Sequence, residues 1–178
     1  MTPSFYGRLF IAAVVGATAL STGARAQTPA RFGLDAGATE PMSAYGSDKN
    51  VGYHIGILVD VRLPPTPFGF RVDGSFHEMK YSGNSTKAQI FMTTANGLLK
   101  LPTGTPLTPY LIGGVGLYNN SRRTLLFNTR SSTDVGVNFG GGLRFELRDV
   151  TTFVEARYHS VTGDARVRIL PITAGVLF

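Results

Sequence analysis

Nine charged side chains share the polar face of a pattern in which polar and apolar residues alternate. Carboxylates and guanidinium groups on one face can do acid–base work, line a path for ions, or pair with one another. Because the two signs are nearly balanced, we predict an interior ion-pair network that holds the fold together; a gated or ion-selective path is the alternative. The nine residues are Asp35, Asp60, Arg62, Arg71, Asp73, Arg144, Glu146, Glu155 and Arg157.

Two carboxylates of this set, Glu146 and Glu155, are the candidates for a paired acid and base. Arg144 and Arg157 stand close by in the sequence, and a neighbouring guanidinium keeps a carboxylate ionised. We therefore predict that both glutamates are structural partners of arginine, and no catalytic residue is assigned.

A metal centre is not predicted, and neither is a cofactor. The chain has no cysteine, so a thiolate nucleophile and a thiolate-ligated metal are both excluded. A metal site would have to be assembled across several strands from histidines that are not at metal-ligand spacing: His54, His77 and His159.

These residues must be positioned by strands, because apolar residues recur with a period of two and no convincing helix follows residue 30. In "DVGVNFGGGLRFELR" Val, Phe and Leu alternate with Gly, Asn, Arg and Glu. Two segments, 88–101 and 109–118, have strand composition but less distinct faces. The eight predicted strands cover residues 31–39, 51–63, 68–77, 88–101, 109–118, 134–148, 153–160 and 170–178.

The connections between these strands alternate in kind. Tight or proline-rich turns occupy 64–67, 102–108 and 148–151, while the other connections are mostly longer and polar, the longest being predicted at 119–133. An even number of strands with short turns at one end and long loops at the other is typical of an up-and-down barrel. We predict an all-β fold, an eight-stranded antiparallel up-and-down β-barrel.

Strand length favours a barrel that crosses a membrane. Strands of about 10 to 13 residues match the ~9–11 that a tilted strand needs to cross a bilayer. Aromatic residues near the strand ends are predicted to form the interfacial girdles. These are Phe68, Phe76, Tyr110, Tyr118, Phe153 and Phe178. The rival is a soluble periplasmic or secreted barrel with the same period and an apolar interior.

The N-terminal segment has the pattern of an export signal. Arg8 precedes the apolar run "LFIAAVVGATAL", and Ala24-Arg25-Ala26 has the form of a signal-peptidase site. We expect residues 1–26 to be removed and residues 27–178 to form one barrel domain. That domain carries 15 Lys and Arg against 11 Asp and Glu, scattered without a basic run, so nucleic acid is not an expected partner.

The mature sequence resembles the small bacterial outer-membrane β-barrels of the OmpA/OmpX-like group. The resemblance is carried by "TPYLIGGVGLY", "VNFGGGLRFEL", "FVEARYHSV" and "PITAGVLF" after the export signal, and covers essentially all of residues 27–178. It implies a monomer in the cell outer membrane, with both chain ends in the periplasm and four loops at the surface. It also implies that terminal Phe178 belongs to the signal that the outer-membrane assembly machinery recognises.

Arginines in the longest loop are candidates for contact with outer-membrane lipid. Guanidinium groups suit charge-assisted bonds to phosphate. The candidates are Arg122, Arg123 and Arg130. The apolar residues Leu125 to Phe127 either contact acyl chains or a partner, or extend the flanking strands above the membrane.

One enzyme hypothesis comes from the same resemblance. Outer-membrane lipid A deacylases are barrels with a His-x-Ser dyad, whereas His159 and Ser160 are adjacent here and face opposite sides of a regular strand. We therefore predict that the protein is not an enzyme and has a structural or surface-interaction role. Porin-like or OmpW-like passage of small solutes is the alternative, and lipid modification is less favoured.

Overall fold

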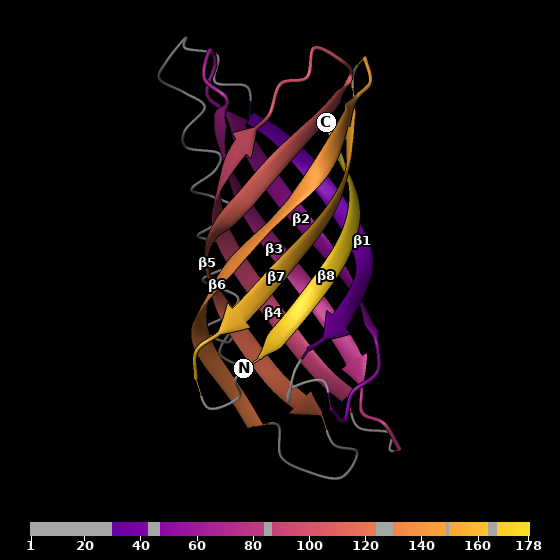
Figure 1. The fold of residues 1–178 in the computed structure, drawn as a ribbon. Helices are drawn as coiled ribbons and strands as arrows, with labels where there is room; N and C mark the ends of the chain where they lie inside the picture. Colours follow the sequence, from indigo (N-terminus) through magenta and orange to yellow (C-terminus); the bar gives the residue numbers. More distant parts are fainter. Residues whose placement is uncertain (1–29, 43–46, 84–86, 124–129, 149, 164–166) are drawn as a thin grey trace, which may run out of the picture.

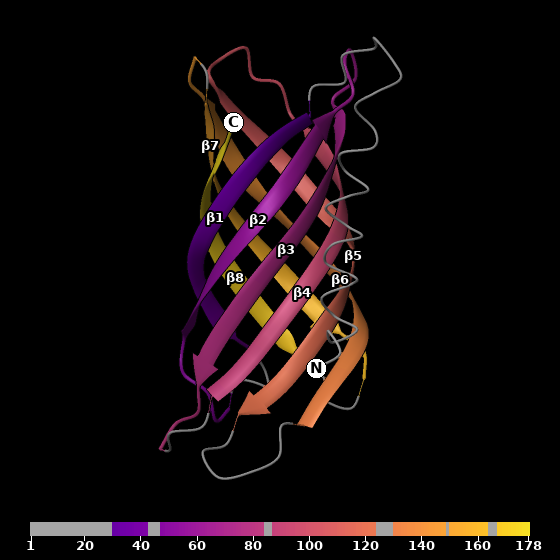
Figure 2. The same ribbon diagram turned by 180° about the vertical axis from the view of Figure 1, so that it is seen from behind.

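Eight strands and the described parts of their connections make up the described chain (Figure 1 and Figure 2). The computed structural model describes residues 30–42, 47–83, 87–123, 130–148, 150–163 and 167–178, without the side chains of 122–131. The predicted signal peptide therefore lies outside the described residues. The strands are β1 Ala30–Pro41, β2 Gly52–Arg62, β3 Phe68–Lys80, β4 Lys87–Lys100, β5 Leu107–Arg123, β6 Arg130–Glu146, β7 Thr151–Val161 and β8 Arg168–Leu177.

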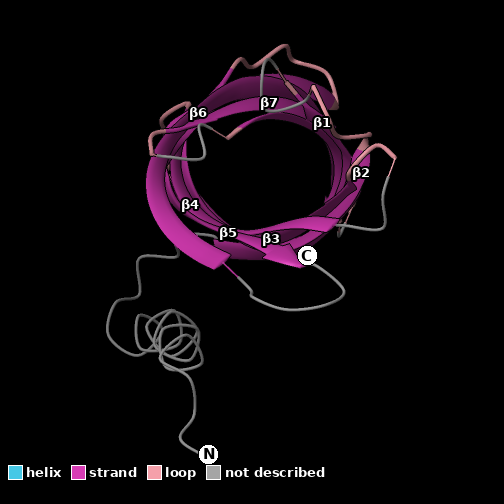
Figure 3. Ribbon diagram, turned by 90° about the horizontal axis from the view of Figure 1, so that it is seen from below, coloured by secondary structure: helices cyan, strands magenta, loops and turns pink. Residues whose placement is uncertain are grey.

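Each strand pairs antiparallel with the next, and β1 pairs with β8, so the sheet closes into a barrel. Seen along the axis, the strands surround a central lumen without a free edge (Figure 3). Closure satisfies every strand edge, which is what a hydrocarbon environment demands. The predicted all-β, eight-stranded antiparallel up-and-down barrel is confirmed. No helix within the described ranges has the length and apolar character needed to span a membrane.

The two ends of the barrel differ less in the length of their connections than the sequence predicted, because among the loop-end connections only residues 42–51 form a clearly longer one. Connections of residues 63–67, 101–106 and 147–150 lie at the end where β8 finishes, which we call the turn end (the upper end in Figure 1). The connections of the opposite end, the loop end, include residues 42–51. In outer-membrane barrels the short turns face the periplasm.

The predicted extent of the longest loop, residues 119–133, is wrong. Strands β5 and β6 continue to Arg123 and from Arg130, with Arg122 opposite Arg130, so only 124–129 connects them. In "NNSRR" both faces of the strand are polar, so polar and apolar residues do not alternate. The sequence pattern therefore does not indicate a strand there. Leu125 to Phe127 lie outside the described residues.

Side-chain faces follow the predicted alternation. Outward-facing apolar residues such as Leu34, Ile55, Val137 and Ile172 are 53–59% exposed, although each is large and apolar. Most inward-facing residues on the same strands are charged, polar or glycine, and the aliphatic exceptions include Leu58, Ile169 and Leu177. An apolar exterior around a polar interior is the arrangement expected of a membrane barrel.

Three of the six aromatic residues predicted to form the interfacial girdles do not lie on the outer surface. Tyr110, Tyr118 and Phe153 point into the lumen and are 1%, 0% and 2% exposed. Their rings lie on glycines of the wall: a Cβ on Gly142 would lie 2.7 Å from the Tyr110 ring, and one on Gly175 2.4 Å from Phe153. A flat ring fills the space that glycine leaves. Phe68 and Phe178 do face outward, and Phe76 is half-buried.

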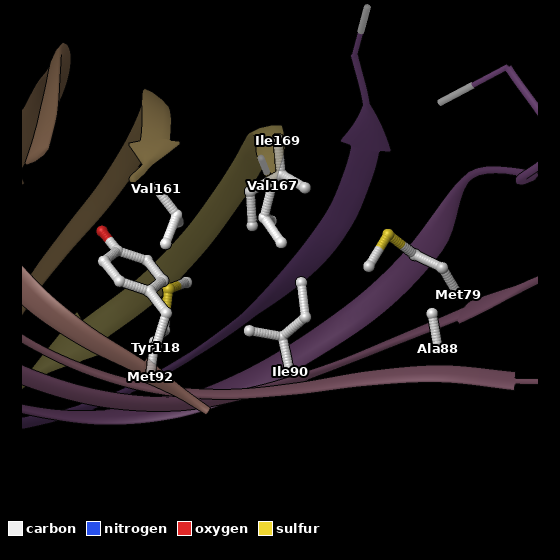
Figure 4. Close-up of a cluster of buried hydrophobic side chains, with 8 residues drawn as sticks. All are labelled: Met79, Ala88, Ile90, Met92, Tyr118, Val161, Val167 and Ile169. Atoms are coloured by element: carbon white, nitrogen blue, oxygen red, sulfur yellow. The ribbon is translucent and has the colours of Figure 1, made fainter. Parts of the chain in front are cut away.

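The lumen is filled in layers. Toward the loop end, eight side chains from five strands and the last loop form an apolar cluster across the lumen (Figure 4). The turn-end half holds most of the buried charges and two smaller apolar clusters, and the histidines lie between. We call the first group the loop-end cluster: Met79, Ala88, Ile90, Met92, Tyr118, Val161, Val167 and Ile169.

Candidate functional site: charges and histidines in the lumen

Ion pairs cross the lumen between strands on opposite sides of the barrel. The first two join β2 to β6. Arg144 Nη2 donates to Asp60 Oδ2 at 2.5 Å, and both side chains are 1% exposed. Arg62 Nη2 donates to Glu146 Oε1 at 2.7 Å at the rim, where the glutamate is 47% exposed.

The second two join β3 to β7. Arg71 Nη1 donates to Glu155 Oε2 at 2.9 Å, and neither side chain exceeds 1% exposure. Arg157 reaches both carboxylate oxygens of Asp73 at 3.2 Å, a bidentate contact. In all four pairs the partners are 84 residues apart in the sequence. We call these four contacts the transverse pairs.

The order of the charges explains why the transverse pairs form. Strand β2 carries "DVR" and β6 carries "RFE", so the two patterns have opposite signs at corresponding positions. The same holds for "RVD" on β3 and "EAR" on β7. Because each side chain points inward from one wall, its counter-charge comes from the wall that faces it.

Further contacts join three of the transverse pairs, all except Arg62–Glu146, into one network. Asp60 also accepts from Arg71, whose Nη2 lies 3.2 Å away, and Arg157 Nε lies 2.9 Å from Glu155 Oε1. The Tyr110 hydroxyl donates to Glu155 Oε2 at 2.7 Å. Buried charges are tolerated when they are paired and hydrogen-bonded, and each of these acids has several donors.

Aromatic rings cover the guanidinium groups. The Arg71 guanidinium carbon lies 4.8 Å from the Phe153 ring centre, and that of Arg144 lies 4.8 Å from the Tyr110 ring centre. A ring face attracts a cation, more strongly where water is excluded. The inward aromatics therefore belong to the charge network.

The structure joins eight of the nine predicted charges in pairs and leaves Asp35 apart. Asp35 is half-buried, lies over Gly56 and makes no ion pair with any described residue. Glu146 and Glu155 are not brought together as a pair of carboxylates, since each is held by a different arginine. Whether the nine residues have a functional role beyond these contacts stays a prediction.

Two of the histidines stack between the charges and the loop-end cluster. The rings of His54 and His77 are 4.7 Å apart and 20° from parallel. The Thr39 hydroxyl contacts both Nδ1 atoms, at 3.0 and 2.7 Å. The remaining ring nitrogens contact Thr173 and Ser75 at 3.0 and 3.1 Å.

Because their ring nitrogens are engaged with hydroxyls, His54 and His77 are structural. Among the described residues no group of three or more potential ligands is arranged to hold a metal ion. The sequence placed these histidines on inward faces but gave no sign that they would meet.

His159 and Ser160 do not form a catalytic dyad in this structure. His159 points into the lumen, is 1% exposed and shares a 2.8 Å hydrogen bond through Nδ1 with the Tyr118 hydroxyl. Ser160 is the next residue of the regular strand β7 and pairs with Val137, whose side chain faces outward. Without a bulge, adjacent residues of a strand face opposite sides.

The predicted lipid-contact residues lie together in the register. Lys80 on β3 pairs with Lys87 on β4, and Lys87 pairs with Arg123 on β5, so three cations stand on one row at the loop end. Arg122 pairs with Arg130, and the side chains of these three arginines lie outside the described residues. Glu78 neutralises part of the row through a 2.6 Å contact with Lys87.

The last residue, Phe178, lies on the outer surface at the turn end. Its side chain is 63% exposed, and its backbone N–H donates to the carbonyl of Phe32 at 2.8 Å. The terminal strand therefore stays in the sheet up to the last residue. Its role in assembly remains a prediction.

The closed barrel, its apolar exterior and its terminal strand agree with a family model. The model described as "Outer membrane protein beta-barrel domain" matches residues 10–178. The chain belongs to this family. Membership places the protein in the cell outer membrane, as the exposed apolar face also requires.

Solved structures with the same fold include several outer-membrane barrels. Neisserial surface protein A is 22% identical with a TM-score of 0.70, covering 83% of this chain and 95% of its own. Ail, the attachment invasion locus protein of Yersinia pestis, is 11% identical with a TM-score of 0.57, covering 83% and 95%. The outer membrane enzyme PagL is 12% identical with a TM-score of 0.51, covering 84% and 98%. A comparison with curated protein sequences finds no significant match.

Proposed function

We propose that the protein is a non-conducting outer-membrane barrel whose rigid, filled lumen supports a surface for interaction at the loop end. The observation that carries this proposal is the filling of the lumen from wall to wall. The transverse pairs bridge opposite strands in the turn-end half. The loop-end cluster fills the lumen in the other half. An eight-stranded barrel is just wide enough for side chains to fill it.

The filled lumen argues against porin-like or OmpW-like passage of solutes. An ion would have to break buried ion pairs and then pass side chains that are less than 7% exposed. Lipid modification is also disfavoured, because His159 is bonded to Tyr118 and faces away from Ser160. Structural relatives named for the cell surface and for attachment and invasion support the surface role by analogy.

The proposed surface includes the row Lys80, Lys87 and Arg123, with outer-membrane lipid as its partner. Like charges on directly opposed residues repel each other, and an anion over the row would relieve the repulsion. Arg122 and Arg130 pair with each other at the next register position, and their contact with lipid remains a prediction.

Conductance tests the closed lumen. The mature protein, reconstituted in a planar lipid bilayer, is expected to give no conductance steps, and Arg62→Ala at the exposed rim should give none either. Steps from the wild-type protein that change amplitude in Arg144→Ala would refute the proposal and favour the pore.

Labelling of intact cells tests the surface. Because the chain has no cysteine, single cysteines at Ser131 and Thr103 report on the two ends separately. A membrane-impermeant maleimide should label the Ser131→Cys variant and leave Thr103→Cys unlabelled until the outer membrane is breached. Labelling of neither site in intact cells would instead indicate a periplasmic barrel.

A further inference from the structure

Among the described residues, the lumen mouth at the turn end carries more positive than negative charge. Lys100 lies on the inward face of β4, where Asn96 and Leu98 are buried, and it pairs with the inward-facing Tyr110, whose ring centre lies 4.8 Å from the Arg144 guanidinium carbon. Arg31 lies on the inward face of β1, pairs with Asp60 in the register and donates to the Thr151 hydroxyl. The described part of the mouth thus holds four cations, Arg31, Arg62, Lys100 and Arg144, and two carboxylates, Asp60 and Glu146.

Both carboxylates of the mouth are already engaged. Asp60 accepts from Arg144 and also from Arg71, deeper in the lumen. Glu146 accepts from Arg62. Lys100 is half-buried, and its ammonium group makes no hydrogen bond or ion pair with any described residue, although its backbone N–H donates to the Pro67 carbonyl at 2.9 Å. The ammonium group of Lys100 therefore has no carboxylate partner among the described residues.

Two arginine donors in the same place also lack a partner. Arg144 binds Asp60 through Nη1 and Nη2, while its Nε is buried without a hydrogen bond to any described residue. Arg62 binds Glu146 through Nη2, and its buried Nε is likewise without one. An unsatisfied buried N–H costs about 1–3 kcal/mol, more on a charged group, and each such group needs an explanation.

A glycine of the wall lies beside these donors. Gly69 stands between Arg62 on β2 and Leu98 on β4 in the register, so the wall contributes no side chain of its own at this inward position. The position is tight against the wall, since a Cβ on Gly69 would lie 2.8 Å from the Val61 carbonyl oxygen. Lys100 and Arg62 therefore approach the mouth from either side of a position without a side chain.

We propose that the turn-end mouth binds a small oxyanion, a phosphate or carboxylate group, held by the Lys100 ammonium and the Nε donors of Arg62 and Arg144. The anion accepts hydrogen bonds that the two acids do not, and its negative charge offsets part of the excess positive charge. Charge-assisted hydrogen bonds of this kind are stronger than those between neutral groups. In the outer-membrane orientation this site opens to the periplasm.

Calorimetric titration of the full mature chain in neutral detergent tests the site. Inorganic phosphate and acetate are titrated separately at constant ionic strength against a chloride baseline. The wild-type protein should bind phosphate saturably. Lys100→Gln should weaken binding roughly tenfold or more, as expected for loss of a charged hydrogen-bond donor. Arg168→Gln is the matched control, because it removes one positive charge at the other end of the barrel, from an exposed residue at the start of β8.

The two anions distinguish the ligand chemistry. Binding of both supports a general oxyanion site, and binding of phosphate alone restricts it to tetrahedral anions. Absence of saturable binding of either anion, or equal weakening by Lys100→Gln and Arg168→Gln, would overturn the proposal. Far-UV circular dichroism and gel mobility without heating establish that both variants are folded. A conducting barrel would refute the proposed function without affecting this test.

Discussion

Glu155 is the carboxylate on which the lumen network depends most, and its neutralisation is our main prediction. It accepts from Arg71, Tyr110 and Arg157 and is 3% exposed. Glu155→Gln keeps the size of the side chain but removes one of three fully buried acids that balance three buried arginines. Leaving buried charge uncompensated typically costs about 3–5 kcal/mol.

Glu146→Gln is the matched control. The same substitution removes a carboxylate that also bonds an arginine at 2.7 Å, but the side chain is 47% exposed. Exposed pairs are worth about 0–1 kcal/mol because water screens both charges. The two variants therefore separate burial from the mere presence of an ion pair.

The assay is reversible urea unfolding in lipid vesicles or detergent. The chain has no tryptophan, so far-UV circular dichroism and the gel mobility of unheated samples report folding. We expect Glu155→Gln to lower the free energy of unfolding by about 3 kcal/mol or more, and Glu146→Gln by less than about 1 kcal/mol. Combining Glu155→Gln with Arg71→Met restores the charge balance and should recover part of the loss.

Equal effects of Glu155→Gln and Glu146→Gln would refute this reasoning, and so would a loss under about 1 kcal/mol for Glu155→Gln. The first result would mean that the lumen is hydrated enough to screen its charges. The second would mean that the network contributes specificity without stability.

Three further predictions concern packing and assembly. Ile169→Ala in the loop-end cluster should cost about 2–5 kcal/mol in the same urea titration, whereas Ile172→Ala, outward and 59% exposed, should cost clearly less. Gly140→Ala should destabilise or prevent folding, because its Cβ would lie 2.2 Å from the Ala156 carbonyl oxygen; Gly97→Ala, with 3.9 Å of room, is the control and should fold normally. Removal of Phe178 should lower the amount of protein in outer-membrane fractions without changing the amount synthesised; unchanged membrane levels would show that the terminal ring is not part of the assembly signal.

Strand positions and faces were readable from the sequence because strand geometry is local. Alternation put Asp60, Arg71, Arg144, Glu155 and Arg157 on one face before any partner was known, and the structure places all five inside. The same rule predicts that Phe153 faces inward, because it lies two residues before Glu155 and therefore on the same face of β7. Its position near a strand end instead favoured the girdle.

The extension of β5 and β6 was missed for a different reason. Residues 119–123 are polar on both faces, so the alternation that marks a half-buried strand disappears above the membrane. Pairing between the two strands, such as Asn119 with Thr133, keeps the backbone extended there. A periodicity rule detects burial on one face and does not detect a hydrogen-bonded ladder in water.

The sequence by itself determined the class of fold, the eight strands, the side of most strands that faces lipid and the near balance of charge inside. It even contained the complementary order "DVR", "RVD", "RFE" and "EAR". Only the tertiary structure decided which charges meet. Partners 84 residues apart face each other because closure of β1 on β8 sets β2 opposite β6 and β3 opposite β7. Alternation is a property of a few consecutive residues, whereas contact across the lumen depends on the curvature of the whole sheet.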